Sequence, residues 1–119
     1  MSRDIFKEYD NGTVIEAEII RREGLRDWGA PPFVVESIDG IEVEKDRYST
    51  ARSLAHIFEK YDNPRLEIDE GLIPIEVAID GNPAISTFLH GVHEFSKDEI
   101  AETMDVKTET VTKYLRRFR

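Results

Sequence analysis

The stretch SKDEIAETMDVKTETVTKYLRRF, from Ser96 to Phe118, decides how the second half of this chain folds. Ser96 is a good helix N-cap, and Glu99 three residues later completes a capping box. The spacing predicts a helix that runs to about Met104, a turn over MDVK, and a further helix that begins near Thr108. Two helices joined by such a short turn meet at a steep angle.

Apolar residues recur on one side of both predicted helices. We expect these residues to form a small shared core, made of Ile100, Ala101, Met104, Val106, Val111 and Leu115. Ala101 matters most, because only a small side chain lets the second helix cross closely. Upstream, Asn82-Pro83 predicts another helix start, with Asn82 as the cap, and Gly91 is expected to end that helix.

This pattern resembles the helix-turn-helix family of DNA-binding domains, as found in small prokaryotic and archaeal transcriptional regulators. The family pattern is Glu-Ile-Ala, an apolar residue, a turn, a second apolar residue, a Thr-rich helix start and Thr-Val…Tyr-Leu. The matching residues are Glu99-Ile100-Ala101, Met104, Asp105, Val106, Lys107-Thr108-Glu109-Thr110-Val111 and Tyr114-Leu115. The resemblance covers roughly the last 24 residues, and the preceding helix completes a tri-helical unit.

One position departs from the family pattern. Asp105 stands where the family usually has a glycine in the left-handed conformation. Aspartate tolerates that conformation better than most residues, so we expect the fold to be kept. Its negative charge, however, would repel phosphate near a duplex.

The resemblance implies which side chains face DNA, namely those at the turn and on the exposed side of the last helix. Carried over, they are Lys107, Thr108, Glu109, Thr112, Lys113 and Arg116, with Arg117 and Arg119 placed for phosphate. Cationic and hydroxyl side chains contact phosphates or base edges, and Glu109 can accept from cytosine. The alternative is a solvated helix face whose terminal cations complement the helix dipole.

The charge of the whole chain is −9, yet the charges are unevenly distributed. Residues 96–119 hold six basic and five acidic residues, and Lys113 to Arg119 hold four basic residues and no acid. Overall charge therefore says little about where phosphate docks. An acidic, lysine-poor surface resembles that of proteins from a high-salt cytoplasm, and an acidic protein from an ordinary cytoplasm is an equal alternative.

Residues 1–81 alternate apolar and polar positions between Asn-Gly and Asp-Gly pairs, a pattern typical of strands and hairpins. The segment TVIEAEIIRR is expected to be a strand with Ile15, Ala17 and Ile19 on one face, although Thr13 and Glu16 also have capping-box spacing. Asp39-Gly40 predicts a hairpin with a tight two-residue turn.

The rest of this half predicts one amphipathic helix and two more strands. Its apolar face is expected to consist of Ala51, Leu54, Ala55, Phe58 and Tyr61. Ser49 or Thr50 is available as its cap. The segments RLEID and IPIEVAID are expected to return to strands, and the loop with Trp28 and Phe33 to close one end of the core.

Few residues suggest chemistry. The chain has no cysteine, which excludes disulfides, thiolate nucleophiles and cysteine-ligated zinc. His90, His93 and Glu94 lie close in sequence, with His56 as a conceivable partner, but their spacing matches no known protease motif, and a hydrogen-bonding role is favoured over a metal site. Alternating glutamates such as Glu16/Glu18 and Glu42/Glu44 are typical of the wet face of a sheet.

The sequence therefore predicts an α+β protein with an antiparallel sheet and one helix over residues 1–81 and a helix-turn-helix unit over 82–119. We expect a cytoplasmic, non-enzymatic homodimer that binds double-stranded DNA in transcription regulation, without a cofactor, metal or membrane partner. The first part is expected to serve dimerisation, partner binding or sensing. The alternatives are an adaptor whose helical unit docks on protein, and an enzyme built on the sheet.

Overall fold

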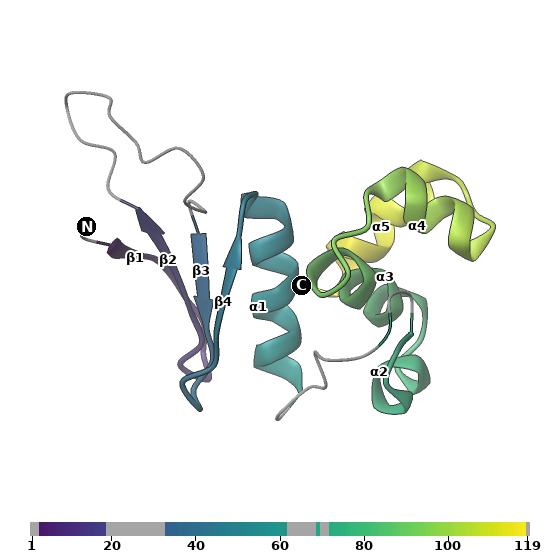
Figure 1. Cartoon of the computed structure of the whole chain (residues 1–119). Helices are drawn as coiled ribbons and strands as arrows, with labels where there is room; N and C mark the ends of the chain where they lie inside the picture. The colour runs from purple at the N-terminus through teal and green to yellow at the C-terminus, as the bar shows by residue number, and fades with distance from the viewer. Residues whose placement is uncertain (1–2, 19–32, 62–68, 70–71, 119) are drawn as a thin grey trace, which may run out of the picture.

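Four antiparallel strands followed by five helices make up the computed structural model, which describes residues 3–18, 33–61, 69 and 72–118 (Figure 1). The strands are β1 (Arg3–Glu8), β2 (Val14–Glu18), β3 (Phe33–Glu36) and β4 (Glu42–Lys45), in the order β1-β2-β3-β4. The helices are α1 (Tyr48–Lys60), α2 (Ile75–Ile79), α3 (Asn82–Gly91), α4 (Lys97–Met104) and α5 (Thr108–Phe118). The predicted α+β class and N-terminal antiparallel sheet are confirmed, and β1 is a strand that the sequence did not specify.

Both hairpins of the sheet use the same three-residue turn. In the first, the Gly12 N–H donates to the Tyr9 carbonyl (2.9 Å) and Gly12 has a φ of 97°. In the second, the Gly40 N–H donates to the Ser37 carbonyl (3.0 Å) and Gly40 has a φ of 85°. The expected two-residue turn at Asp39-Gly40 is therefore wrong by one residue. A tight turn followed by a left-handed glycine also matches the strand twist, and here it includes Ile38.

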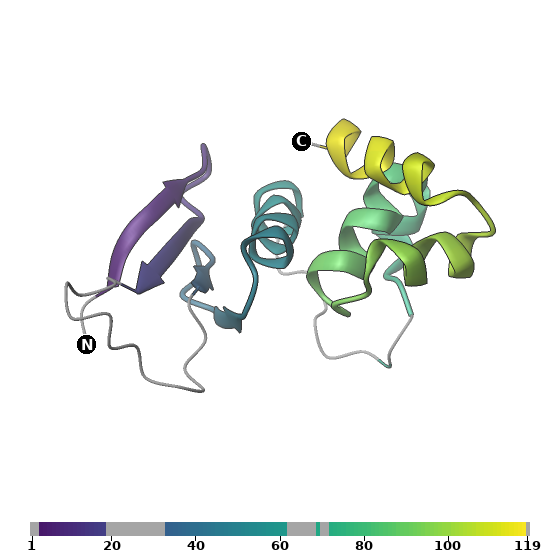
Figure 2. The ribbon, with the colours of Figure 1, turned by 90° about the horizontal axis from the view of Figure 1, so that it is seen from above.

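Helix α1 lies between the sheet and the other helices, as Figures 1 and 2 show from two directions. Its sheet-facing side packs Leu54, Ala55 and Phe58 in one core cluster with strand residues such as Ile15 and Val35. These helix residues belong to the face expected from the sequence.

The opposite side of α1 is also buried, which the sequence did not predict. Ile57, fully buried, packs with Val77 of α2 and with Ala84 and Phe88 of α3. This cluster draws on residues from both sides of position 81. The division into units 1–81 and 82–119 stays a prediction.

Gly91, at the end of α3, sits against the backbone of α1. A Cβ atom at this position would lie 2.5 Å from the Leu54 nitrogen and 2.8 Å from the Ser53 carbonyl carbon. Only a hydrogen atom fits in such a gap, so the closest approach of these two helices requires glycine.

Three further local predictions are wrong. IPIEVAID contains helix α2 rather than a strand. In a strand, Ile75, Val77 and Ile79 would share one face, but Val77 is buried while Ile75 and Ile79 are 75% and 76% exposed. Alternating β-branched residues cannot distinguish a strand from a short helix.

The other two corrections concern caps. Helix α1 begins at Tyr48, before its expected caps Ser49 and Thr50. Helix α3 begins at Asn82, one residue before its expected first residue, Pro83, and neither helix has a side-chain cap. Gly81, with a φ of 94°, precedes α3 as its cap residue. Trp28, Ile19 and most of RLEID lie outside the described residues.

The predicted capping box of α4 is present in full. The Glu99 N–H donates to the Ser96 hydroxyl (3.1 Å), and the Ser96 N–H donates to the Glu99 carboxylate (3.0 Å). These two bonds satisfy amide groups that have no partner inside the helix.

We expect Ser96→Ala to lower the free energy of unfolding by about 1 kcal/mol, because the side-chain acceptor of the cap is lost. Urea denaturation followed by circular dichroism measures this change. Ser49→Ala is the matched control, since Ser49 is exposed and α1 has no side-chain cap. Equal losses in the two variants would contradict the capping role.

Candidate nucleic-acid interface

Helices α3, α4 and α5 share a core of their own. Ile100, Ala101, Val111 and Leu115 are buried there, with Met104 and Val106 partly buried around them, as the sequence predicted. Leu89 of α3 completes the cluster and is 1% exposed. This packing fixes the position of α5 relative to α4.

The turn between α4 and α5 is closed by Asp105 in the left-handed conformation, with φ 55° and ψ 50°. The Val106 N–H donates to the Ala101 carbonyl (2.9 Å), which satisfies a carbonyl at the end of α4. Aspartate therefore occupies the backbone conformation in which glycine is most common, as expected.

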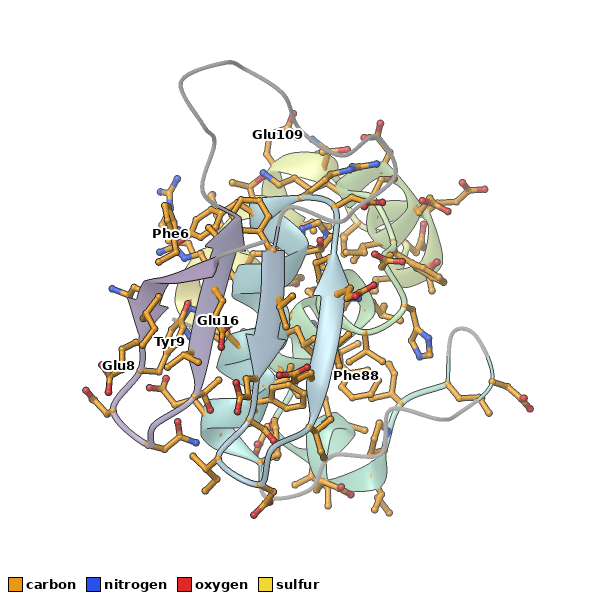
Figure 3. The ribbon with its side chains drawn as sticks, turned by 60° about the vertical axis from the view of Figure 1, so that its left-hand side comes forward. Phe6, Glu8, Tyr9, Glu16, Phe88 and Glu109 are labelled. Atoms are coloured by element: carbon orange, nitrogen blue, oxygen red, sulfur yellow. The ribbon has the colours of Figure 1, made fainter. Side chains whose placement is uncertain are left out.

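Helix α5 is strongly amphipathic. Val111 and Leu115 are buried against α3 and α4. The opposite side carries most of the candidate DNA-contacting residues, of which Lys107, Glu109, Lys113, Arg116 and Arg117 are exposed and Thr108 and Thr112 half-buried. Arg119 lies outside the described residues. Figure 3 shows Glu109 on the outer surface of this helix.

Four basic residues lie on this side of the molecule, in α5 and in the turn before it. Within the described part of the chain, Lys107, Lys113, Arg116 and Arg117 form no ion pair with a carboxylate. All four are exposed. An exposed cation that is free of an internal partner can pair with an external anion without first breaking a bond.

The two threonines of α5 use their hydroxyl groups inside the protein. The Thr108 hydroxyl donates to the Asp98 carboxylate of α4 (2.9 Å), and the Thr112 hydroxyl donates to the Thr108 carbonyl (3.4 Å). Asp98 therefore holds a negative charge at the N-terminus of α5. This contact was not predictable from the sequence, because the two residues belong to different helices.

The C-terminal end of α5 is anchored to the rest of the protein by Phe118. Its ring stacks on Tyr61, with centroids 6.4 Å apart, and the Lys60 ammonium lies 5.3 Å from its centroid. Tyr61 in turn donates a hydrogen bond to Asp80, and burial together with this bond raises the pKa of the Tyr61 hydroxyl. Both ends of α5 are thus fixed by side chains.

The histidines make hydrogen bonds to backbone groups, which is the role favoured from the sequence. His90 Nδ1 lies 2.8 Å from the Phe95 carbonyl oxygen, and His93 Nε2 lies 2.7 Å from that of Leu72. Among the described residues, no three His, Cys, Asp or Glu side chains are grouped so that they could hold a metal ion.

Glu94, next to His93, has a φ of 59° and forms an ion pair with Lys45 of β4 (3.6 Å). Burial lowers the pKa of Lys45, while Glu94 opposes this shift. The pair ties the edge of the sheet to the segment that leads into α4.

The glutamates of the sheet lie mostly on its outer face. Glu42 and Glu44 are exposed, and Glu16 and Glu36 are half-buried. Glu42 and Glu36 are direct cross-strand neighbours. This arrangement is typical of the solvated face of an antiparallel sheet.

Comparison with protein-family models, with curated proteins and with solved structures finds no match to this chain. In the regions that the structure describes, every helix is too short or too polar to cross a membrane.

Proposed function

We propose that the protein binds double-stranded DNA sequence-specifically through α4 and α5 and acts as a transcriptional regulator. The observation that carries this proposal is the exposed basic side of α5, whose cations form no ion pair with another described residue and which lies opposite the buried Val111 and Leu115. A helix held this way presents one polar side to a partner. The major groove of B-DNA is wide enough to admit it.

The side chains of α5 provide both kinds of DNA contact. Glu109, Lys113 and Arg116 follow one another at intervals of four and three residues, so they lie along one stripe of the helix. Arginine and lysine recognise guanine edges or phosphates, and a carboxylate accepts from cytosine. In this proposal Lys107, before α5, and Arg117, near its end, contact phosphates.

A homodimer is part of the proposal. One such unit buries little surface on DNA, and two units on adjacent half-sites double the contacts. Their recognition helices are then about 34 Å apart, which is one turn of the duplex. The sheet and α1 are available for dimerisation or sensing.

Fluorescence anisotropy with a labelled duplex, titrated at several salt concentrations, tests the proposal. We expect binding whose logarithmic salt slope is about −0.9 for each phosphate contacted. Selection from a random duplex library then measures sequence preference. Absence of binding even at low salt would exclude the DNA function.

Such a negative result would favour the adaptor alternative. The observation on its side is the acidic surface of α4, where Asp98, Glu102 and Asp105 are exposed. These carboxylates suit a basic protein surface better than a nucleic acid.

We expect Asp98→Asn to raise DNA affinity by about three- to tenfold at low salt, because it removes a like charge beside the phosphates. The asparagine carbonyl can still accept from Thr108, so the N-terminus of α5 keeps its position. Anisotropy measures the change, with Asp39→Asn in the distant hairpin turn as the control. An unchanged or lower affinity would show that this end of α5 does not approach DNA.

A further inference from the structure

A polar cavity of about 340 Å³ lies between β1 and α1. It is on the sheet side of α1, whereas the proposed DNA interface belongs to the helices on the other side of α1. Its walls include Lys7, Tyr9, Tyr48, Arg52, His56 and Glu59. The four α1 residues among them are spaced four, four and three apart, so they form one stripe along the helix. Tyr48 packs against the sheet core, and none of the four residues belongs to the proposed DNA contacts.

Two ring contacts join β1 and the hairpin turn after it to this stripe beside the cavity. At one end the Phe6 and Tyr48 rings are 5.1 Å apart. At the other end the Tyr9 and His56 rings are also 5.1 Å apart. Figure 3 labels Phe6 in β1 and Tyr9 just after the end of this strand.

Two cations line the cavity between these ring contacts. Lys7 of β1 and Arg52 of α1 line it, and neither forms an ion pair with another residue in the described regions. The Lys7 ammonium lies 5.9 Å from the centroid of the Tyr9 ring, which holds it beside the cavity. Two cations that line one cavity and form no ion pair with another described residue are suited to an external carboxylate, even in a chain with a net charge of −9.

Acidic residues line the cavity as well, at the end near the hairpin turn. The Asp10 N–H donates to the Glu59 carboxylate (3.2 Å), and His56 Nδ1 lies 3.8 Å from the other oxygen of Glu59. Glu8 completes the lining. The cavity is therefore polarised, with cations in its middle and carboxylates at one end.

We propose that this cavity binds a small zwitterion of the amino-acid class. The carboxylate of the ligand pairs with Arg52 and Lys7, and its ammonium group faces Glu59 and Asp10. The volume is at the lower end of the range for small-molecule sites and suits a single amino acid. A simple anion would meet the carboxylates, and a simple cation would meet Lys7 and Arg52. A ligand with both charges satisfies both ends.

Isothermal titration calorimetry of the full chain with each standard amino acid tests the proposal. We expect at least one to bind with a Kd below about 1 mM. The N-acetyl and carboxamide derivatives of that amino acid, which each lack one charge, are expected to bind at least about tenfold more weakly. If no amino acid binds, or if either derivative binds as tightly as the zwitterion, the proposal is wrong.

Variants locate the site. Arg52→Gln and Lys7→Gln, on two different elements, are each expected to weaken binding at least about tenfold. Arg47→Gln, at an exposed arginine outside the cavity, is the matched control and should bind as the wild type does. Unchanged affinity in a folded Arg52→Gln or Lys7→Gln variant would place the ligand elsewhere and overturn the assignment. The titrations contain no DNA, so their outcome is independent of the proposed DNA function.

Discussion

Replacing Gly91 with alanine is expected to lower the free energy of unfolding by about 3 kcal/mol, at the upper end of the usual cost of overpacking. The added Cβ would meet the α1 backbone at 2.5 to 2.9 Å, and backbone atoms cannot move aside as a flexible side chain can. In an unobstructed helix the same substitution stabilises by about 1 kcal/mol. A loss of stability on replacing Gly91 therefore indicates that α1 and α3 are in close contact at this residue, and a gain indicates that they are not.

Gly40→Ala is the control for this substitution. Gly40 has a φ of 85° and no atom near its missing Cβ, so its replacement costs only backbone strain, about 1 kcal/mol. Urea denaturation of both variants gives the comparison. A Gly91→Ala protein as stable as the wild type would mean that α1 and α3 are farther apart than the structure shows.

The double variant Lys113→Glu and Arg116→Glu is expected to lower DNA affinity at least about 100-fold at low salt. Both side chains are exposed on the stripe of α5 that we propose enters the groove, and neither forms an ion pair with a carboxylate in the described parts of the chain. Besides losing two phosphate or guanine contacts, the variant brings two like charges to the duplex. Alanine at both positions should also reduce the steepness of the logarithmic salt slope by about 2.

Arg47→Glu is the control, because it reverses an exposed cation outside α4 and α5. Its affinity should stay within about threefold of the wild type. Equal affinity of the double variant and the wild type would exclude α5 as the DNA-contacting helix. In a high-salt cytoplasm the phosphate contribution would be weak, so the comparison should be repeated at high salt, where base contacts dominate.

Local sequence signals predicted much of this fold. The capping box at Ser96, the left-handed turn at Asp105 and the core around Ile100 follow from rules that act within a few residues. The apolar side of α5 followed from helical spacing, and the resemblance to the helix-turn-helix family implied which side chains lie on its exposed side. These features were predictable because each depends on residues that are close in sequence.

The missed features depend on contacts between distant segments. The second buried side of α1, at Ile57, exists only because α3 packs there, and the glycine at position 91 reveals nothing of its neighbour at Leu54. Helix α2 was misassigned because Ile75, Val77 and Ile79 alternate as in a strand. In the helix that forms instead, Val77 packs in one buried cluster with Phe88 of α3.

In the candidate site, too, features set by nearby residues were predicted and contacts between distant residues were not. The polarity of α5 was predicted, whereas the bond from Thr108 to Asp98 and the stacking of Phe118 on Tyr61 were not. The cavity beside Arg52 was missed because Lys7 is far away in sequence. Its one available signal was the spacing of Tyr48, Arg52, His56 and Glu59 on a single helix.

The burial of α1 on two sides determines how this protein unfolds. Its central amides, such as those of Leu54 and Ala55, can reach solvent only when both the sheet and α3 have separated from the helix. We expect these amides to exchange hydrogen only through global unfolding, and those of the five-residue α2 through local opening. The sheet and the helices are then one cooperative unit, whatever each of them binds.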